Sequence, residues 1–295
     1  MARYSAFCEQ TFRRHFQSAF QWVALNLTIL RLRRHPREPL IGVFDCTFMP
    51  KSGTDSYGLG RFFSSAAGRS ERGQEVSILG VVATKSREAF SIDATQTPAG
   101  LSGNCSSETD AATDNAAPQG ASNTYSSVDF YIEQIQDLYD RLADMGVAYW
   151  VGDGFVGDGF YAKRKMFDAI TERGGDLITR LRSDANLRDL ANLRDLYTGP
   201  RKKGPGRPKL YDVKINVDGP EQIDRRFEEV GRLPDRTHVE IWTTEANSPH
   251  FKRNLRIVLL RNRTTGRTLL LGSTDMRCYP KTDPVPVLVR CLHPA

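Results

Sequence analysis

The sequence predicts an α/β fold, in which a mixed β-sheet is flanked by helices and carries a β-rich insertion near the C-terminus. Three runs rich in β-forming residues come first, at 40–48, 75–84 and 88–95. Helical and strand-like segments alternate between 128 and 182, and strands separated by turns fill 211–274. Antiparallel strands followed by alternating helices and strands predict a sheet that contains both strand directions.

The first predicted element is an amphipathic helix. Apolar side chains recur at three- and four-residue steps from Phe12 to Leu30, with arginines off this stripe. The spacing predicts one helix with a face that packs against a core. Pro36 ends it, because proline disfavours the helical conformation of the preceding residue. Arginines follow the apolar stretch and no small-residue cleavage site does, so we interpret it as a cytosolic helix rather than a signal peptide.

The early strands predict an antiparallel meander. The next segment, 97–127, has Leu101 and Tyr125 as its only large apolar residues, so we expect a loop. Ser126 and Ser127 are candidate N-caps of a helix that begins at Val128.

Three further elements complete the central part of the chain. The apolar run 147–151 predicts a buried strand, 161–173 predicts a helix closed by two glycines, and 176–182 predicts another strand. A strand, a helix and a strand in this order make a parallel unit.

This order of elements is that of an RNase H-like domain, in which the first and fourth strands are neighbours. Asp45 lies within the first predicted strand, and Asp153 follows the fourth. An unpaired carboxylate is costly inside a strand, and two carboxylates that meet repel unless a cation lies between them. Two Mg²⁺ ions held by such acids can activate the attacking oxygen and stabilise the leaving oxygen of a phosphodiester. We therefore expect Asp45 and Asp153 to bind Mg²⁺ or Mn²⁺ and to be catalytic.

A local duplication leaves an alternative for the second acid. The string VGDGF occurs twice over 151–160, so Asp158 stands in the same local sequence as Asp153. Attachment to the predicted strand end favours Asp153, whereas the spacing to the following helix favours Asp158. We expect Asp153, with Asp158 as the alternative.

Several strings resemble the IS4-type DDE transposases of bacterial insertion sequences, over roughly 38–274. They are IGVFDCTFMPKSG at 41–53, YWVGDG at 149–154, DLITRLRSD at 176–184 and GRPKLYD at 206–212. The resemblance implies an RNase H-like fold with a β-rich insertion, and Mg²⁺-dependent cutting and joining of DNA at transposon ends. It assigns the first catalytic aspartate to Asp45 and the second to Asp153. It is also compatible with a homo-oligomer on DNA and a place in the bacterial cytoplasm, on the nucleoid.

The C-terminal residues depart from this family, which continues into a helix whose Glu is the third metal ligand. Prolines interrupt 276–295 at positions 280, 284, 286 and 294, and prolines forbid a long helix. We expect Asp275 and Asp283 to be turn or tail residues. The third catalytic acid is therefore missing, and we expect a truncated or frameshifted protein with impaired catalysis.

Positive charge is concentrated in two segments of a chain whose net charge is +6. Residues 1–37 hold seven arginines and one acid, and RKKGPGRPK at 201–209 holds five basic residues and none. The second segment is similar to a minor-groove AT-hook, and Arg180 and Arg182 alternate along a predicted strand, so we expect DNA as the partner. The expected DNA-binding residues are Arg180, Arg182, Arg201, Lys202, Lys203, Arg207 and Lys209.

The predicted organisation has four parts: a basic N-terminal helix (1–37), an RNase H-like core (38–200, with a flexible loop at 97–127), a β-rich insertion (201–275) and an irregular tail (276–295). Five scattered cysteines without a CxxC pair argue against a disulfide framework or a zinc site, and the five histidines show no HExxH spacing. No apolar run approaches the ~18 residues of a membrane span.

Two other functions remain open. The first is a non-catalytic DNA-binding remnant of a transposase. The second is a dinucleotide-binding enzyme of the Rossmann type, because Gly152, Gly154 and Gly157 fit G-x-G-x-x-G, although Asp184 lies later than the usual ribose-binding acid.

Overall fold

The computed structural model describes residues 20–33, 40–53, 56–83, 88–101, 125–144, 154–189, 214–215, 229–232 and 238–276, together with a few single positions. The helical elements are α2 (Trp22–Arg33), α3 (Ser127–Asp144), the 3₁₀-helix η3 (Gly159–Tyr161) and α4 (Arg164–Glu172). The strands are β1 (Leu40–Pro50), β2 (Gly60–Ser64), β3 (Arg69–Ala83), β4 (Glu88–Gln96), β5 (Phe155–Gly157), β6 (Leu177–Arg180), β7 (Arg188–Asp189), β8 (Glu229–Arg232), β9 (His238–Ser248), β10 (Arg253–Asn262) and β11 (Thr268–Ser273).

These strands form one 11-stranded sheet with both strand directions, which confirms the predicted fold class. Its main order is β2-β3-β1-β5-β6-β11-β10-β9-β7, and β4 pairs with β3. Strands β1, β5 and β6 are parallel, whereas β1 and β3 are antiparallel along their length. The first strand therefore lies beside the strand that precedes η3 and α4, as an RNase H-like order requires.

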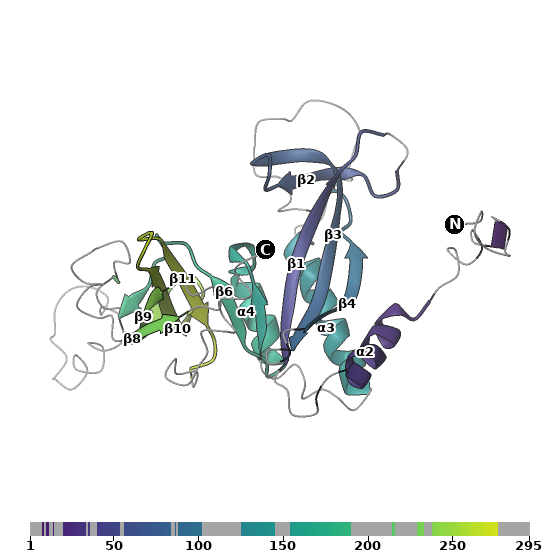
Figure 1. Cartoon of the computed structure of the whole chain (residues 1–295). Coiled ribbons are helices and arrows are strands. Elements are labelled where there is room, and N and C mark those ends of the chain that lie inside the picture. The colour runs from purple at the N-terminus through teal and green to yellow at the C-terminus, as the bar shows by residue number, and fades with distance from the viewer. Residues whose placement is uncertain are drawn as a thin grey trace, which may run out of the picture.

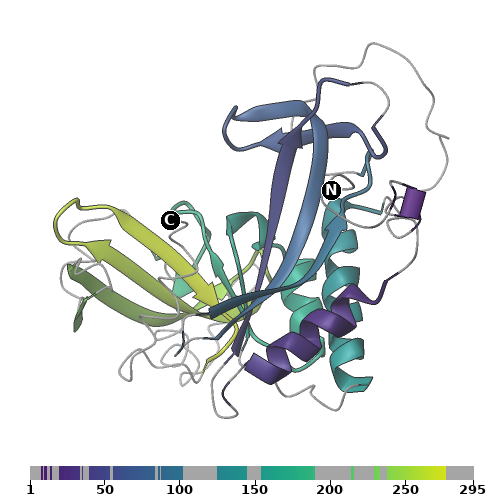
Figure 2. The same cartoon turned by 45° about the vertical axis from the view of Figure 1, so that its right-hand side comes forward.

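The C-terminal strands continue this sheet. Strand β11 pairs antiparallel with β6, with Leu271 beside Arg180 and Ser273 beside Ile178. A turn at Thr265 and Gly266 joins β10 to β11, and Gly266 has the positive φ of 68° that such a turn uses. Figures 1 and 2 show β9–β11 at one end of the sheet and the long β1–β3 ribbon, with β2 at its tip, at the other.

The helices pack on one face of the sheet. Alternate side chains of β1, including Leu40 and Phe44, are buried in a core shared with α2, α3 and α4. Ser126 caps α3, because its hydroxyl accepts from the Asp129 N–H while the Asp129 carboxylate accepts from the Ser126 N–H at 3.0 Å. Ser126 is therefore the cap among the two predicted serines.

The N-terminal prediction is wrong about where the described helix begins. Helix α2 begins at Trp22, and Phe20 lies outside it with 55% of its surface exposed. Leu27 and Leu30 are buried as the apolar stripe predicts, and Asn26 ties α2 to β4 through a 3.0 Å hydrogen bond to the Ile92 carbonyl. The predicted strand at 147–151 and most of the predicted loop, 102–124, lie outside the described residues. No helix of the described segments is long and apolar enough to cross a membrane.

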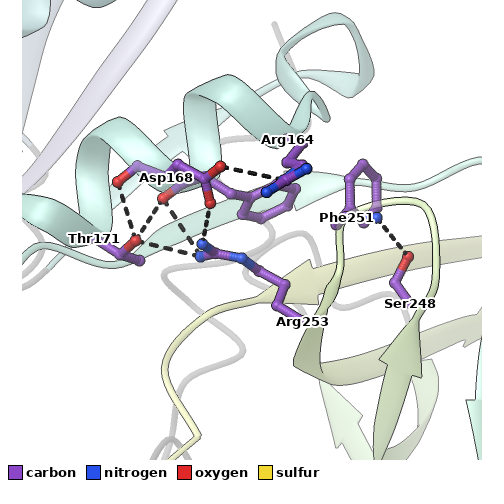
Figure 3. Close-up of polar contacts among 7 residues, drawn as sticks. Arg164, Asp168, Thr171, Ser248, Phe251 and Arg253 are labelled. Atoms are coloured by element: carbon purple, nitrogen blue, oxygen red, sulfur yellow. Dashed lines mark hydrogen bonds and ion pairs between the residues drawn. The ribbon is translucent and has the colours of Figure 1, made fainter.

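The β9–β10 hairpin packs against helix α4. The Phe251 and Phe167 rings are 4.8 Å apart, and the Arg253 guanidinium lies over the Phe167 ring. Arg253 also donates hydrogen bonds to Asp168 and to the Thr171 hydroxyl (Figure 3). The strands after β7 thus support the helix that follows the candidate site.

Candidate functional site

Two aspartates lie at corresponding positions, Asp45 within β1 and Asp158 directly after β5, the parallel strand beside β1. Phe44 of β1 lies beside Gly157 of β5. Asp45 follows Phe44 and Asp158 follows Gly157 in the sequence. Both side chains are exposed, on the opposite side of β1 from the buried Phe44. The register therefore brings together two carboxylates that are remote in sequence.

Each carboxylate is held by one of its two oxygens. Asp45 Oδ1 accepts a 2.9 Å hydrogen bond from the Cys46 N–H, and Asp158 Oδ1 accepts one of 2.8 Å from the Phe160 N–H. Asp158 is the N-cap of η3, and its carbonyl also accepts from the Thr179 hydroxyl at 2.6 Å. The Oδ2 atoms of both aspartates have no hydrogen bond within the described residues.

The surroundings of Asp45 disfavour its ionised form. Partial burial raises the pKa of Asp45 above the ordinary value for a carboxyl group, and the negative charge of Asp158 raises it as well, while the Cys46 N–H opposes the shift. Carboxylate oxygens are the ligands that Mg²⁺ and Mn²⁺ prefer. With one oxygen fixed and one available on each acid, the residues present fit a divalent cation.

A buried layer of aromatic and polar side chains supports Asp45 from behind. The Tyr161 ring lies edge-on to the Phe44 ring at 5.0 Å, and the Tyr161 hydroxyl lies 3.2 Å from Cys46 Sγ. Burial raises the pKa of the Cys46 thiol to about 12, so the thiol is neutral at physiological pH. Tyr131 adds a 2.5 Å hydrogen bond to the buried Glu75. The Tyr161 contacts join η3 to β1, and the Tyr131–Glu75 hydrogen bond joins α3 to β3.

An open, basic cleft of about 530 Å³ begins at Asp158. Phe160, Arg180, Arg182 and Thr268 are among its lining residues. Arg180 follows Thr179, which lies beside Gly157, so Arg180 is level with Asp158 along the sheet. Arg182 is exposed and paired with Asp184 at 3.0 Å, a surface contact that contributes little. Both arginines therefore line the cleft in which a phosphate close to Asp158 would bind.

Phe160 and Thr179, which position or border Asp158, have no distinctive pattern in the sequence. The spacing from the aspartate to helix α4 is the one sequence signal that indicates this part of the chain. Asp153 and the basic segment with Arg201, Lys202, Lys203, Arg207 and Lys209 lie outside the described residues.

The described residues do not complete a set of three metal ligands. No group of three or more His, Cys, Asp or Glu side chains able to hold a metal is found among them. Asp275 lies in a turn after β11, where its N–H donates to the Ser273 hydroxyl at 3.1 Å, and Asp283 is outside the described part.

The glycine pattern does not form a dinucleotide loop in the described residues. Gly157 lies within β5, where a Cβ atom would come within 2.9 Å of the Tyr161 ring, and Gly154 comes just before that strand. A pyrophosphate-binding loop follows its strand instead.

The chain matches a known protein family over most of its length. No curated protein matches the chain. The family described as DDE superfamily endonuclease matches residues 5–246, a span that includes Asp45, Asp158, Arg180 and Arg182. The chain belongs to the DDE superfamily endonuclease family.

Proposed function

We propose that this protein is a transposase that cuts and joins DNA, with Asp45 and Asp158 as two of its metal-binding carboxylates. DDE superfamily endonucleases act on DNA and generally use divalent metal ions. The observation that carries the proposal is the pairing of Phe44 with Gly157, which sets the two acids side by side at the edge of a basic cleft. The geometry supports Asp158 over Asp153, because the described strand next to β1 ends directly before Asp158.

The chain's own residues have three tasks in this mechanism. The free Oδ2 atoms of Asp45 and Asp158 bind divalent cations, while the Cys46 and Phe160 N–H groups fix the orientation of each carboxylate. Cations held by these two carboxylates would supply polarisation of the phosphodiester and activation of the attacking oxygen. Arg180 and Arg182 offset the charge of phosphates in the cleft and position the strand without reading its bases.

The finer parts of the proposal rest on the sequence. The strings around Asp45 and Arg180 support an IS4-type enzyme that binds the ends of an insertion sequence, in a bacterial cytoplasm. The four prolines at 276–295 support an incomplete triad and hence weak catalysis. Mg²⁺ or Mn²⁺ is the cofactor we propose, because both ligands are carboxylates.

Nicking of supercoiled plasmid DNA in Mg²⁺ or Mn²⁺ tests the proposal. Asp45→Asn and Asp158→Asn each remove a ligand worth several kcal/mol in the transition state, so nicking should fall about 100-fold or more. Asp153→Asn and the control Asp137→Asn, on the exposed side of α3, should keep wild-type rates. Nicking by Asp158→Asn at the wild-type rate would contradict the proposal. The ratio of variant to wild type is the readout, because a low absolute rate is expected.

A second candidate is a DNA-binding protein without nuclease activity. The four prolines at 276–295, which interrupt the helix expected to carry the third acid, favour it. It predicts salt-sensitive DNA binding by the wild type, no nicking in either metal, and no effect of Asp45→Asn on binding.

A further inference from the structure

A second basic groove lies at the tip of the ribbon formed by β1, β2 and β3, away from Asp158. It is an open groove of about 730 Å³, and we call it the arm groove. Its charged lining residues are Lys51, Arg61, Arg69, Glu71 and Arg72. In Figures 1 and 2, β1 runs from the centre of the sheet to this tip, where β2 lies.

Three of the four cations in the arm groove are not neutralised by a described acid. Arg69 pairs with Glu71 at 3.1 Å. Arg61 donates to the Ser70 carbonyl at 3.3 Å, and within the described residues neither Lys51 nor Arg72 has an ion pair. Lys51, Arg61 and Arg72 are all exposed, so the groove presents a concentrated positive charge.

Two of these cations face each other across a strand pair. Arg61 of β2 and Arg72 of β3 are direct partners in the antiparallel register. Like charges at directly opposed positions destabilise a sheet, and an anion between them would remove the penalty. The arrangement is that of an anion site rather than of a stabilising surface pair.

The arm groove shares a sheet face with the candidate active site. Asp45 is the partner of Ile78, and side chains alternate along β3, so Arg72, six positions before Ile78, lies on the same face as Asp45. Arg61, as the partner of Arg72, lies there too. Pro50, which borders the groove, is five positions after Asp45 in β1, or about 17 Å at ~3.3 Å per residue.

We infer that the arm groove binds the phosphate backbone of duplex DNA about five base pairs from the bond cleaved at Asp45, taking ~3.4 Å per base pair. This inference rests on the proposed function. None of the residues that line the groove is aromatic, so it has no stacking platform for the bases of a single strand. Contacts of this kind position the duplex and carry no sequence preference.

Binding to a fluorescent duplex of about 40 base pairs, titrated without divalent metal at several KCl concentrations, tests the inference. Each lost phosphate contact should make the slope of log K, where K is the association constant, against log salt concentration less steep by ~0.9. The double variant Lys51→Ala/Arg72→Ala should therefore lose about two units of slope, and its affinity at ~0.1 M salt should fall roughly 60-fold. The control Arg141→Ala/Arg173→Ala removes the same charge from ion pairs at the helical face and should change affinity by less than about threefold.

A second variant separates binding from folding. Arg72→Glu replaces the like-charge pair with a cross-strand ion pair to Arg61, so thermal stability should be kept or raised while duplex binding falls at least as far. A hydroxyl-radical footprint should lose protection about five base pairs from the nick.

Three results would overturn the inference. The first is an unchanged slope and affinity in Lys51→Ala/Arg72→Ala when the wild type binds duplex; the proposed function would then stand alone. The second is a double variant that binds duplex DNA like the wild type but binds single-stranded RNA more weakly or self-associates less. The third is a wild type that does not bind duplex at all, which would remove the proposed function as well.

Discussion

Asp168 of helix α4 and Arg253 of strand β10 form an ion pair that joins the helix after the candidate site to the C-terminal part of the sheet (Figure 3). Their side chains are 36% and 22% exposed, so the pair is half-buried. Arg164 extends the pair along α4, where its Nε lies 3.4 Å from Asp168. Helix α4 comes directly after η3, whose N-cap is Asp158, so this contact fixes the helix next to the candidate site.

Arg253→Ala should destabilise the protein. It leaves Asp168 with less compensation and removes the stacking of the guanidinium on Phe167, at a cost of about 1–3 kcal/mol. At roughly 2–4 °C per kcal/mol for a protein of this size, Tm should fall by about 2–12 °C. Arg141→Ala is the matched control, because its ion pair with Asp137 is exposed and worth about 0.5 kcal/mol or less. Equal losses for the two variants would show that Arg253 adds nothing beyond a surface charge.

Gly42→Ala should disturb the pairing that places the two aspartates. A Cβ atom at Gly42 would lie 2.4 Å from Phe155 Cε1, and Phe155 is fully buried in the neighbouring strand. Relief of this clash requires the buried Phe155 ring, or β5 with it, to move, so we expect a loss of about 1–3 kcal/mol by thermal unfolding. A Cβ atom at Gly53 meets no atom within 4 Å, and Gly53→Ala should be near neutral.

A double variant identifies the cause. If the Phe155 ring is the obstacle, Gly42→Ala combined with Phe155→Leu should cost less than the sum of the single changes. Additive losses would point to another origin.

Asp45→Asn should stabilise the metal-free protein at neutral pH. The pKa of Asp45 is raised in the folded state, so the folded protein holds its proton more tightly than the unfolded chain. The stability associated with this group is therefore present at low pH and is lost as pH rises from the unfolded pKa, near 4, through the higher folded pKa. Asparagine stays neutral, so its advantage should appear above the folded pKa and vanish in acid. A Tm series across pH checks this, and a Tm of Asp45→Asn below that of the wild type at pH 7 would contradict it.

The parts of the fold that the sequence predicts are those with strong local patterns. Strands β1 and β4 and helix α3 have long runs of β-forming residues or an unbroken helical stripe, so their positions follow from local chemistry. The sequence does not predict β2, because Gly60–Ser64 is short and buries only Phe62 and Ser64, which is too weak a pattern without β3 beside it. The pairing of β11 with β6 could not be predicted, because tertiary packing sets a contact so distant in sequence.

The sequence predicts one acid of the candidate site and that a later strand lies beside it, but it does not decide which residue is the second acid. A lone aspartate inside an apolar strand makes Asp45 a candidate, and the RNase H-like order of elements predicts that a strand from the later part of the chain lies beside it, as β5 does. The duplication of VGDGF prevents a choice between Asp153 and Asp158 from the sequence, because both copies present the same residues and only the register with β1 distinguishes them. Phe44 lies beside Gly157, and this pairing supports Asp158 as the second acid. Asp153 lies outside the described residues.

Binding of Mn²⁺, followed by electron paramagnetic resonance of the free ion, tests most directly whether Asp45 and Asp158 share a cation. The readout does not depend on nuclease activity, so an incomplete triad does not obscure it. Removal of one of two carboxylate ligands should weaken Mn²⁺ binding about tenfold or more in Asp45→Asn and in Asp158→Asn, since coordination to these oxygens is the main attraction. Asp153→Asn should bind like the wild type. Weaker binding in Asp153→Asn together with wild-type binding in Asp158→Asn would contradict the account.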